Sequence, residues 1–477
     1  MNYEPVIGLE VHVQLKTKTK VFCACPTEFG KEPNSQVCPV CLGFPGSLPV
    51  LNKTALEYAA KAGLALNCTV QKYTKFDRKH YYYPDLPKNI QISQYDLPIS
   101  KDGYLDIEIG GRTKRIRIKR AHLEEDAGKL VHHENASLVD YNRTGQPLLE
   151  IVSEPDINSP EEAYEYLTSL KSIIQYTGVS DCDMEKGTLR CDANISLRPA
   201  GTKGLGVKSE LKNLNSFKAV REALTYEIER HEQVITGGEQ VVQETRLWDE
   251  KTGRTISMRT KEEAKDYRYF PEPDLPPFEW TEELIETIRK TIPELPKARA
   301  MRFMKEYGLQ EADAKQLTCS MQAADLAEKT MRAYPGANKK TVVNWLIGPL
   351  ASEANARSLQ WHELGIKPED LVELIGYVDS RQISNLAAKA VLTEMIDTRR
   401  TAGLIIKDKN LAQISDESSI EKDVAAVIAE NPKVVEDFKS GKSNALMFLV
   451  GQVMKKTKGK ANPQVVGDIL KRRLQNA

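Results

Sequence analysis

Apolar and polar residues alternate along residues 6–15, close to the N-terminus of the chain. Successive side chains of a strand point to opposite faces, so the alternation predicts a strand with one apolar and one polar face. The polar face carries Glu10, His12 and Gln14. A carboxylate and an imidazole at this spacing can bind one cation together. The apolar face carries Ile7, Leu9, Val11, Val13 and Leu15.

The same alternation recurs in two later segments, residues 189–198 and 208–212. The first places Arg190 and Asp192 on its polar face, and the polar face of the second holds Lys208, Glu210 and Lys212. An ordinary solvent-facing strand explains any one of these segments. Together they predict a sheet whose polar face is the floor of an active site, with acids to hold a metal and bases to hold phosphate.

An acidic segment and a predicted turn lie between these strands. Residues 122–129 contain three consecutive acids, Glu124, Glu125 and Asp126. Gly145 and Pro147 indicate a turn, which is followed by a short strand that places Glu150 and Glu154 on one face. Oxygen ligands from several elements suit Mg²⁺, which usually takes one or two protein carboxylates and shares itself with substrate phosphates.

The apolar spacing predicts mixed strands and helices in the first part of the chain and only helices in the rest. Amphipathic helices are predicted over residues 51–66, 160–177 and 217–236, and a hairpin joins 246–248 to 255–258. Strands joined by hairpins and mixed with helices predict an α+β class. Four prolines in residues 271–277 predict a rigid linker and the clearest domain boundary. Beyond it the chain is predicted helical, over 281–290, 297–307, 311–334, 339–360, 368–375 and in short helices from 384 to 477.

Four of the eight cysteines are clustered, and they form two close pairs, Cys23 with Cys25 and Cys38 with Cys41. Two such pairs separated by an irregular loop predict a tetrahedral zinc site. Reduced, partly buried thiols that only pack are the alternative. No apolar run approaches the ~18 residues of a membrane span, and residues 1–4 lack the features of a signal peptide. The expected location is therefore the cytoplasm, where disulfides are rare.

The 477 residues contain 67 Lys and Arg and 67 Asp and Glu, so the formal net charge is zero. The charges are nevertheless distributed unevenly along the chain. Residues 431–477 hold ten Lys and Arg against three Asp and Glu, a local excess of seven positive charges. A basic tail on an acidic body predicts binding of a polyanion. A solvated helix surface is the alternative. The length predicts two or three domains.

Long motifs along the chain carry a resemblance to a known family. They are residues 82–89, 91–96, 122–129, 140–150, 190–199, 211–217 and 266–274. Over essentially its whole length the chain resembles the B subunit of the bacterial tRNA-dependent amidotransferases, the GatB family. The resemblance implies a ligase, a glutamine-hydrolysing enzyme that uses ATP to phosphorylate the side-chain carboxylate of Glu-tRNA(Gln) or Asp-tRNA(Asn) and then amidates it. It implies misacylated tRNA as substrate and a heterotrimer with two partners, an amidase and a small third protein.

The resemblance also implies a fold and a division into domains. Residues 1–293 form an antiparallel-sheet catalytic cradle similar to the glutamine synthetase and guanidino kinase architecture, and this domain includes the four-cysteine zinc site. Residues 294–407 form a helical domain, and residues 408–477 form a basic helical tail that binds tRNA. The tail resembles a small helical module that some bacteria also make as a free-standing protein.

Residue roles follow from the same resemblance. The metal ligands are expected to be Glu10, His12, Glu125, Glu150 and Asp192, with Glu124 and Glu210 as further candidates. The catalytic residues among them are Glu125, Glu150 and Asp192. ATP phosphates or the acyl end are expected to contact Lys79, Lys88, Arg190, Lys208 and Lys212. The expected cofactors are ATP, Mg²⁺ and Zn²⁺. The local positive charge of the tail, rather than the resemblance, makes Lys455, Lys456, Lys458 and Lys460 the expected tRNA contacts.

The sequence contains no Ser-Lys amidase pattern and no Gly-flanked nucleophilic Cys, so ammonia is expected from a partner. Two other classes of protein stay open. A zinc-stabilised RNA-binding protein without catalysis would not need clustered acids, which repel phosphate. A free-standing amidoligase acting on a small carboxylate would not need a basic helical tail. ATP hydrolysis that depends on misacylated tRNA distinguishes the three classes.

Overall fold

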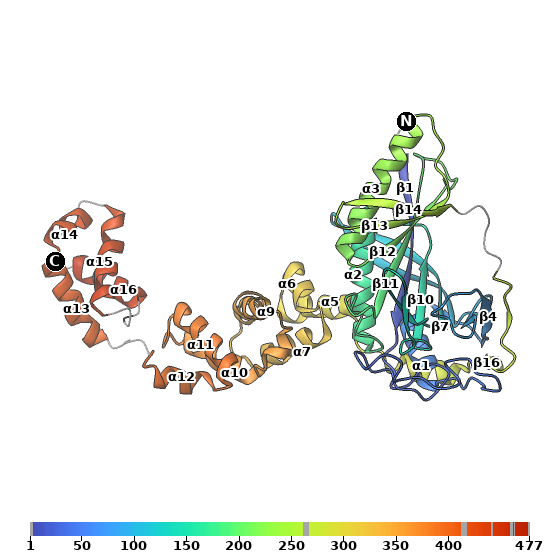
Figure 1. The fold of residues 1–477 in the computed structure, drawn as a ribbon. Coiled ribbons are helices and arrows are strands. Elements are labelled where there is room, and N and C mark those ends of the chain that lie inside the picture. The colour runs from blue at the N-terminus through green and yellow to red at the C-terminus, as the bar shows by residue number, and fades with distance from the viewer. Residues whose placement is uncertain are drawn as a thin grey trace. The chain divides into compact units, whose positions relative to one another are not determined.

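The computed structural model describes residues 3–260, 267–411, 417–439, 442–457, 461 and 463–475. The chain divides into two compact units, Met1–Leu295 and Pro296–Ala477. The first unit mixes strands and helices and is built around one large sheet, whereas the described part of the second is helical (Figure 1). The α+β class predicted from the strand and helix patterns is confirmed.

The first unit is organised around a nine-stranded sheet in the order β14-β13-β12-β11-β1-β10-β7-β6-β2. Every neighbouring pair in it is antiparallel except β12 and β13, which run parallel. The predicted strand at residues 6–15 lies at the middle of this sheet as β1. The strands are β1 (Tyr3–Gln14), β2 (Thr69–Val70), β6 (Ser100–Ile109), β7 (Arg112–Glu125), β10 (Pro147–Ser153), β11 (Leu189–Pro199), β12 (Ser209–Leu214), β13 (Glu244–Asp249) and β14 (Arg254–Thr260).

Three helices pack on the apolar face of this sheet, namely α1 (Lys53–Ala65), α2 (Pro160–Thr177) and α3 (Phe217–Thr236). Local sequence determines where they begin. Ser159 and Ser216 cap α2 and α3, because each hydroxyl accepts a hydrogen bond from a backbone N–H in the first turn. Ile7, Leu9, Val11 and Val13 on the apolar face of β1 are fully buried beneath them. The opposite, polar face of the sheet is therefore left for the site.

Two short sheets tie the segment 267–280 to an early part of the chain. One sheet has the order β15-β4-β5, and the other pairs β16 with β3. The bounds of their strands, of the β8–β9 hairpin and of the following helix are β3 (Tyr73–Thr74), β4 (Asp77–His80), β5 (Ile90–Ser93), β8 (Lys129–His132), β9 (Ser137–Asp140), β15 (Phe270–Pro271), β16 (Phe278–Glu279) and α4 (Glu282–Arg289).

The prediction of an interdomain linker at residues 271–277 is wrong. This segment lies within the first unit, where Glu272 and Leu275 are buried. The Arg78 guanidinium donates two hydrogen bonds of 2.7 Å to the Glu272 carboxylate, a bidentate pair that holds the segment in place. Proline-rich backbone is also compatible with the edge of a sheet, and Pro271 occupies such an edge in β15. The boundary between the units falls after Leu295.

The second unit departs from the predicted helices at two places. The helix predicted over residues 311–334 is two helices, because Ser320 caps a new helix by accepting a hydrogen bond from the N–H of Ala323. The helix predicted over 339–360 contains a π-helical turn with Pro349 inside it. Proline has no N–H to donate, so the regular α-helical pattern is interrupted there.

The described helices of this unit build two separate hydrophobic cores. The elements from α5 through α12 contribute residues to one core, and the elements from α13 through α16 contribute residues to the other. No helix among the described residues is both long and apolar enough to cross a bilayer. The elements are α5 (Pro296–Tyr307), α6 (Glu311–Leu317), α7 (Met321–Ala333), α8 (Lys340–Trp345), η1 (Leu346–Leu350), α9 (Ala351–Arg357), η2 (Trp361–Leu364), α10 (Pro368–Asp379), α11 (Asn385–Thr398), α12 (Ala402–Asp408), α13 (Glu417–Glu430), α14 (Pro432–Lys439), α15 (Ser443–Lys456) and α16 (Pro463–Gln475).

Candidate active site

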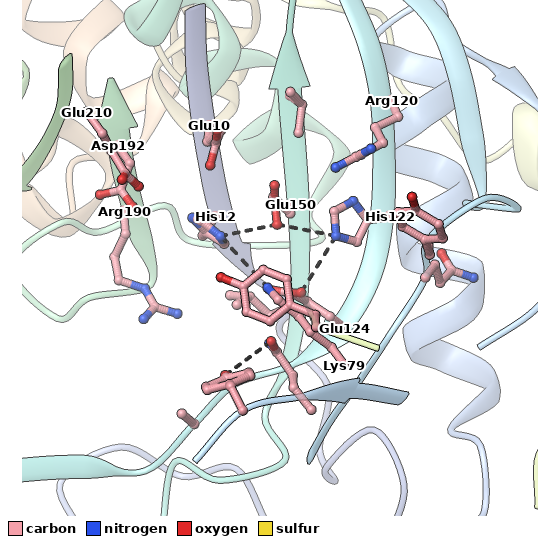
Figure 2. A pocket seen from close by; sticks show the side chains of 18 of the residues that line it. Glu10, His12, Lys79, Arg120, His122, Glu124, Glu150, Arg190, Asp192 and Glu210 are labelled. Atoms are coloured by element: carbon pink, nitrogen blue, oxygen red, sulfur yellow. Dashed lines mark hydrogen bonds and ion pairs between the residues drawn. The ribbon is translucent and has the colours of Figure 1, made fainter. Parts of the chain in front are cut away.

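A cavity of about 820 Å³ opens on the polar face of the large sheet. Strand register explains which side chains meet there. His12 on β1 lies opposite Glu150 on β10 and opposite Arg190 on β11, and Glu150 in turn lies opposite His122 on β7. Directly opposed residues of antiparallel strands are near neighbours on one face. A row of charged and imidazole groups therefore crosses the sheet, as Figure 2 shows.

The centre of this row is a cluster of two imidazoles and two carboxylates. His12 Nε2 lies 3.5 Å from Glu150 Oε2 and 3.9 Å from Glu124 Oε1. His122 Nε2 lies 3.3 Å from Glu150 Oε2 and 3.6 Å from Glu124 Oε2. All four contacts are drawn in Figure 2. We call these four residues, His12, His122, Glu124 and Glu150, the histidine–glutamate cluster.

The cluster is electrostatically self-compensated. Burial opposes the charged form of His122, but Glu150 and Glu124 outweigh it and raise the pKa of His122 to about 9. The pKa of His12 is also raised, against the effect of burial, by Glu150 and Glu124. The same contacts overcome burial at Glu150, whose pKa lies well below its usual range. The carboxylates are therefore ionised at neutral pH and need positive charge beside them.

The donor set fits a divalent cation. One ligand atom each from His12, Glu124 and Glu150 lies within 4.8 Å of the other two. A cation there would replace the imidazolium proton of His12 as the partner of the carboxylates, because a ligating imidazole must be neutral. Two buried carboxylates this close together are unfavourable without a positive charge beside them, whether from a protonated imidazole or from a metal ion. The arrangement therefore provides one nitrogen ligand and two carboxylate oxygen ligands for one ion.

A second carboxylate group lies beside the first on β1, β11 and β12, and a lysine bridges it. Lys212 Nζ lies 2.5 Å from Asp192 Oδ2 and 3.2 Å from Glu210 Oε1. Two neutral donors orient the other oxygens, since Asn194 donates to Glu10 and Thr245 donates to Glu210. The carboxylates of Glu10, Asp192 and Glu210 thus all reach the cavity, as Figure 2 shows.

Four of the five basic residues predicted to bind phosphate line the cavity, namely Lys79, Arg190, Lys208 and Lys212. Arg190 is held in place by an acid that the sequence did not single out as functional. Its Nη2 donates to Asp126 Oδ2 at 2.7 Å, and Asp126 also accepts a hydrogen bond from Gln14 at 2.9 Å. An arginine fixed in this way is preorganised to bind an anion.

Glu125 and Lys88 were predicted in the site, but the structure does not place them there. Neither lines the cavity. Lys88 Nζ lies 2.5 Å from Glu125 Oε2, and the N–H of Ile92 donates to Glu125 Oε1 at 2.9 Å. Glu124 and Glu125 are consecutive in β7, so they point to opposite faces of the sheet. Glu124, named as a further candidate, is therefore the residue on the cavity side.

Three features of the cavity were missed or misplaced by reasoning from sequence. His122 belongs to the histidine–glutamate cluster, and the alternation of Arg120, His122 and Glu124 in one strand was the signal for it. Glu154, predicted to share a face with Glu150, follows the end of β10 and does not line the cavity. The tyrosines of the cavity wall had no sequence signal as a group, because they come from distant segments. They are Tyr81, Tyr95, Tyr267 and Tyr269.

The structure brings the four clustered cysteines together, apart from the cavity. One sulfur from each of Cys23, Cys25, Cys38 and Cys41 lies within 4.8 Å of the others. The pKa of the Cys41 thiol is lowered to about 4, chiefly by a hydrogen bond from Cys23 and with help from Lys20. Four converging thiol groups, one of them readily ionised, fit a tetrahedral thiolate site for zinc.

Two of the four predicted tRNA-binding lysines can be placed. Lys455 and Lys456 lie in the last turn of α15, where positive charge is favourable to the helix dipole. Lys455 is exposed, and Lys456 Nζ lies 2.7 Å from Glu430 Oε1. Lys458 and Lys460 lie outside the described residues.

Comparison with known proteins identifies the class to which this fold and site belong. Residues 5–286 match the family model described as the GatB/GatE catalytic domain, and residues 325–474 match the one described as the GatB domain. The chain belongs to the GatB family, as its motifs predicted.

Individual relatives are similar along their full length. The B subunit of the aspartyl/glutamyl-tRNA(Asn/Gln) amidotransferase of Carboxydothermus hydrogenoformans is 57% identical over 477 residues, which is 99% of both chains. The protein of the same name from Caldanaerobacter subterraneus subsp. tengcongensis is 58% identical over 475 residues, 99% of this chain and 100% of the relative. The one from Persephonella marina is 53% identical over 475 residues, 100% of both chains.

Proposed function

We propose that this chain is the subunit of a tRNA-dependent amidotransferase that converts Glu-tRNA(Gln), Asp-tRNA(Asn) or both to the amidated form. Full-length similarity to subunits of that name supports the assignment. The observation that carries the chemistry is the cavity on the polar face of the sheet, where ionised carboxylates and basic side chains converge. This combination suits the activation of a carboxylate by ATP.

The chemistry proceeds in two displacements. A carboxylate is a poor electrophile, so one of its oxygens first attacks the γ-phosphorus of ATP, and ADP leaves. Ammonia then attacks the carbonyl carbon of the acyl phosphate, the C–O bond to phosphate breaks, and the nitrogen loses a proton to give the amide. Phosphoryl transfer depends mainly on positioning and on neutralising charge.

Side chains of the cavity have separate roles in this scheme. A divalent cation, Mg²⁺ in this proposal, would be held by His12, Glu124 and Glu150 and would supply charge neutralisation at the phosphates. Arg190 and Lys79 bind anionic oxygens of ATP or of the substrate carboxylate. Lys212, which lies in β12, and Lys208, the residue before that strand, bind the same oxygens. Glu10, Asp192 and Glu210 form the second acidic group, in which Asp192 and Glu210 orient Lys212.

Finer features of the architecture belong to the same proposal. The cysteine site binds Zn²⁺, and the three domains are residues 1–293, 294–407 and 408–477. The division between α12 and α13 is supported by the two separate hydrophobic cores of the second unit. The catalytic unit has the glutamine synthetase and guanidino kinase architecture in this proposal, which its large, mostly antiparallel sheet supports.

Glutamine supplies the nitrogen in this proposal, but a partner hydrolyses it. The sequence holds no amidase constellation, and the charged groups of the cavity are occupied in carboxylate activation. The partners are the amidase and the small third protein of the amidotransferase, which together with this chain form a heterotrimer. Ammonia released by the amidase then reaches the cavity.

The isolated chain is expected not to use glutamine but to accept ammonia at high concentration. The physical reason is that the activation site is complete in this chain, whereas the glutaminase site is not part of it. The measurement is formation of Gln-tRNA and Asn-tRNA from both misacylated tRNAs and ATP, with glutamine or ammonium as donor. Each reaction is run with the isolated chain and with the reconstituted heterotrimer.

The controls distinguish the proposal from the two other classes of protein. Uncharged tRNA and free glutamate should not stimulate ATP cleavage. Glutamine hydrolysis by the isolated chain would contradict the division of labour. ATP cleavage stimulated by a small free carboxylate would favour an amidoligase, and tRNA binding without any ATP cleavage would favour a non-catalytic RNA-binding protein.

The basic tail is expected to contribute to tRNA affinity. Replacing Lys455 and Lys456 together by glutamate should weaken tRNA binding and flatten its salt dependence, because each lost phosphate contact reduces the slope of log K against log salt by about 0.7–0.9. The measurement is tRNA affinity across a salt series. A matched control replaces Lys218 by glutamate, because Lys218 is an exposed lysine of α3, outside the tail, and pairs with Glu222 as Lys456 pairs with Glu430. Equal affinity and slope in the tail variant and wild type would show that these lysines are only a solvated surface.

A further inference from the structure

One wall of the active-site cavity is aromatic, and the amidation chemistry described above does not use it. Tyr95 and Tyr269 are stacked almost in parallel, with ring centroids 4.4 Å apart and an interplanar angle of 11°. Tyr267 contacts Tyr269 edge-on at 6.1 Å, and it contacts Tyr81 edge-on at 6.1 Å. All four rings line the cavity. We call these four tyrosines the aromatic wall.

Backbone pairing fixes the aromatic wall in place. Tyr267 and Tyr269 immediately precede β15, which pairs with β4 so that Phe270 lies opposite Arg78. The N–H of His80 donates to the carbonyl of Tyr267 at 2.9 Å. Tyr95 follows β5, the other neighbour of β4. The rings are therefore preorganised, which reduces the entropic cost of binding against them.

Lys79 joins the aromatic wall to the histidine–glutamate cluster. Its Nζ lies 5.0 Å from the centre of the Tyr267 ring and 5.7 Å from that of Tyr81. Figure 2 shows Lys79 beside Glu124, and the charge of Glu124 helps to raise the pKa of Lys79. A ligand that placed an aromatic ring on the wall would thus have its anionic part directed toward the basic and metal-binding side of the cavity.

We propose that the stacked pair Tyr95 and Tyr269 is a platform on which an adenine base of the substrate stacks. This inference rests on the proposed function, because that reaction brings two adenosines to the site. One is the base of ATP, and the other is the 3′-terminal adenosine of the tRNA, whose ribose carries the amino acid. Tyr95 is 55% exposed, so the stack of rings is accessible. Aromatic platforms bind bases through their π faces.

Two amide side chains that line the same cavity, Gln91 and Gln94, form hydrogen bonds within the protein. Gln94 Oε1 accepts hydrogen bonds from the N–H groups of Ile99 and Leu123. Gln91 Nε2 donates to the carbonyl of Glu125, and Gln91 Oε1 accepts from Tyr81. These amides are therefore occupied in holding the cavity wall. Recognition on the platform is by stacking, so it should favour purines over pyrimidines and discriminate little between adenine and other purines.

Two fluorescent probes distinguish the two sources of adenine. One is 2-aminopurine riboside triphosphate, and the other is a misacylated tRNA whose 3′-terminal base is 2-aminopurine. Both are added to the reconstituted heterotrimer, and fluorescence quenching reports stacking of the labelled base. Quenching of the triphosphate alone assigns the platform to ATP, and quenching of the tRNA alone assigns it to the terminal adenosine. Quenching of both assigns it to the two substrates in turn.

The variants separate ring stacking from folding. Tyr95→Leu should abolish the quenching. The affinity for the substrate whose base stacks on the platform should fall, or the KM for that substrate rise, roughly 5- to 150-fold, the range for losing one stacked base. Tyr95→Phe keeps the ring and should retain both. Tyr82→Leu is the matched control, because Tyr82 is 69% exposed and does not line the cavity.

Equal quenching in wild type and Tyr95→Leu, or no quenching by either probe, would overturn the platform. Failure of the proposed function looks different. In that case the wild-type heterotrimer would not cleave ATP in response to misacylated tRNA. If it does so while the Tyr95→Leu variant binds both probes as the wild type does, the reaction stands and only the platform is rejected.

Discussion

Replacing Glu124 by glutamine is expected to abolish tRNA-dependent ATP cleavage, whereas the same change at Glu125 is expected to leave the site of the folded protein intact. Glu124 supplies a carboxylate to the histidine–glutamate cluster. A neutral amide cannot replace that charge, so divalent-cation affinity should fall by more than about 100-fold, the upper range for losing only an outer partner of a ligand. The measurements are calorimetric titration with Mg²⁺ or Mn²⁺ and ATP cleavage.

Glu125→Gln provides the control from the adjacent position in the same strand. Its effect should be on stability, because the buried carboxylate pairs with Lys88 and accepts from the N–H of Ile92. Breaking a buried ion pair on one side costs on the order of 3 kcal/mol, which chemical denaturation can measure. Loss of cation binding in Glu125→Gln and its retention in Glu124→Gln would show that the faces of β7 have been assigned the wrong way round.

Removing the zinc proposed at the four cysteines is expected to unfold the loop around it and to lower activity. Cys38→Ser should eliminate zinc binding, and apparent binding free energies of structural zinc are about 10–16 kcal/mol in small domains. The loop also supports the active site. The N–H of Gln36 donates to Asn142, and the N–H of Val21 donates to the carbonyl of Gly145. Both partners lie in the turn that leads into β10, the strand of Glu150.

Elemental analysis and limited proteolysis measure this effect. Wild type should contain about one zinc per chain, and Cys38→Ser should contain none and be cut in the segment 17–47. Cys319→Ser is the matched control, because Cys319 is an exposed thiol outside the cluster and should change neither result. A metal-free chain that stays folded, active and unable to bind zinc would show that the four thiols only pack.

Much of the site was predictable because strand alternation is a local property. The alternation of apolar and polar residues in β1 and β11 predicted that Glu10, His12 and Asp192 lie on polar strand faces, and in the structure all three line the cavity. Helix α2 begins at Pro160 and α3 ends at Thr236, as predicted, because their caps are local as well. These features follow from the sequence since neighbouring residues alone decide them.

Other features required the tertiary structure. Three consecutive acids at residues 124–126 do not reveal which of them faces the cavity, because that depends on the register of β7 against β10. The aromatic wall joins Tyr95 to Tyr269, residues 174 positions apart whose approach is made by pairing of β4 with β5 and β15. The proline-rich segment joins a sheet because Pro271 pairs with Asp77 of β4, and the side chain of Arg78 in the same strand holds Glu272. Sequence pattern determined the faces of the strands, whereas long-range pairing decided which faces meet, since strand pairing depends on partners that local periodicity does not encode.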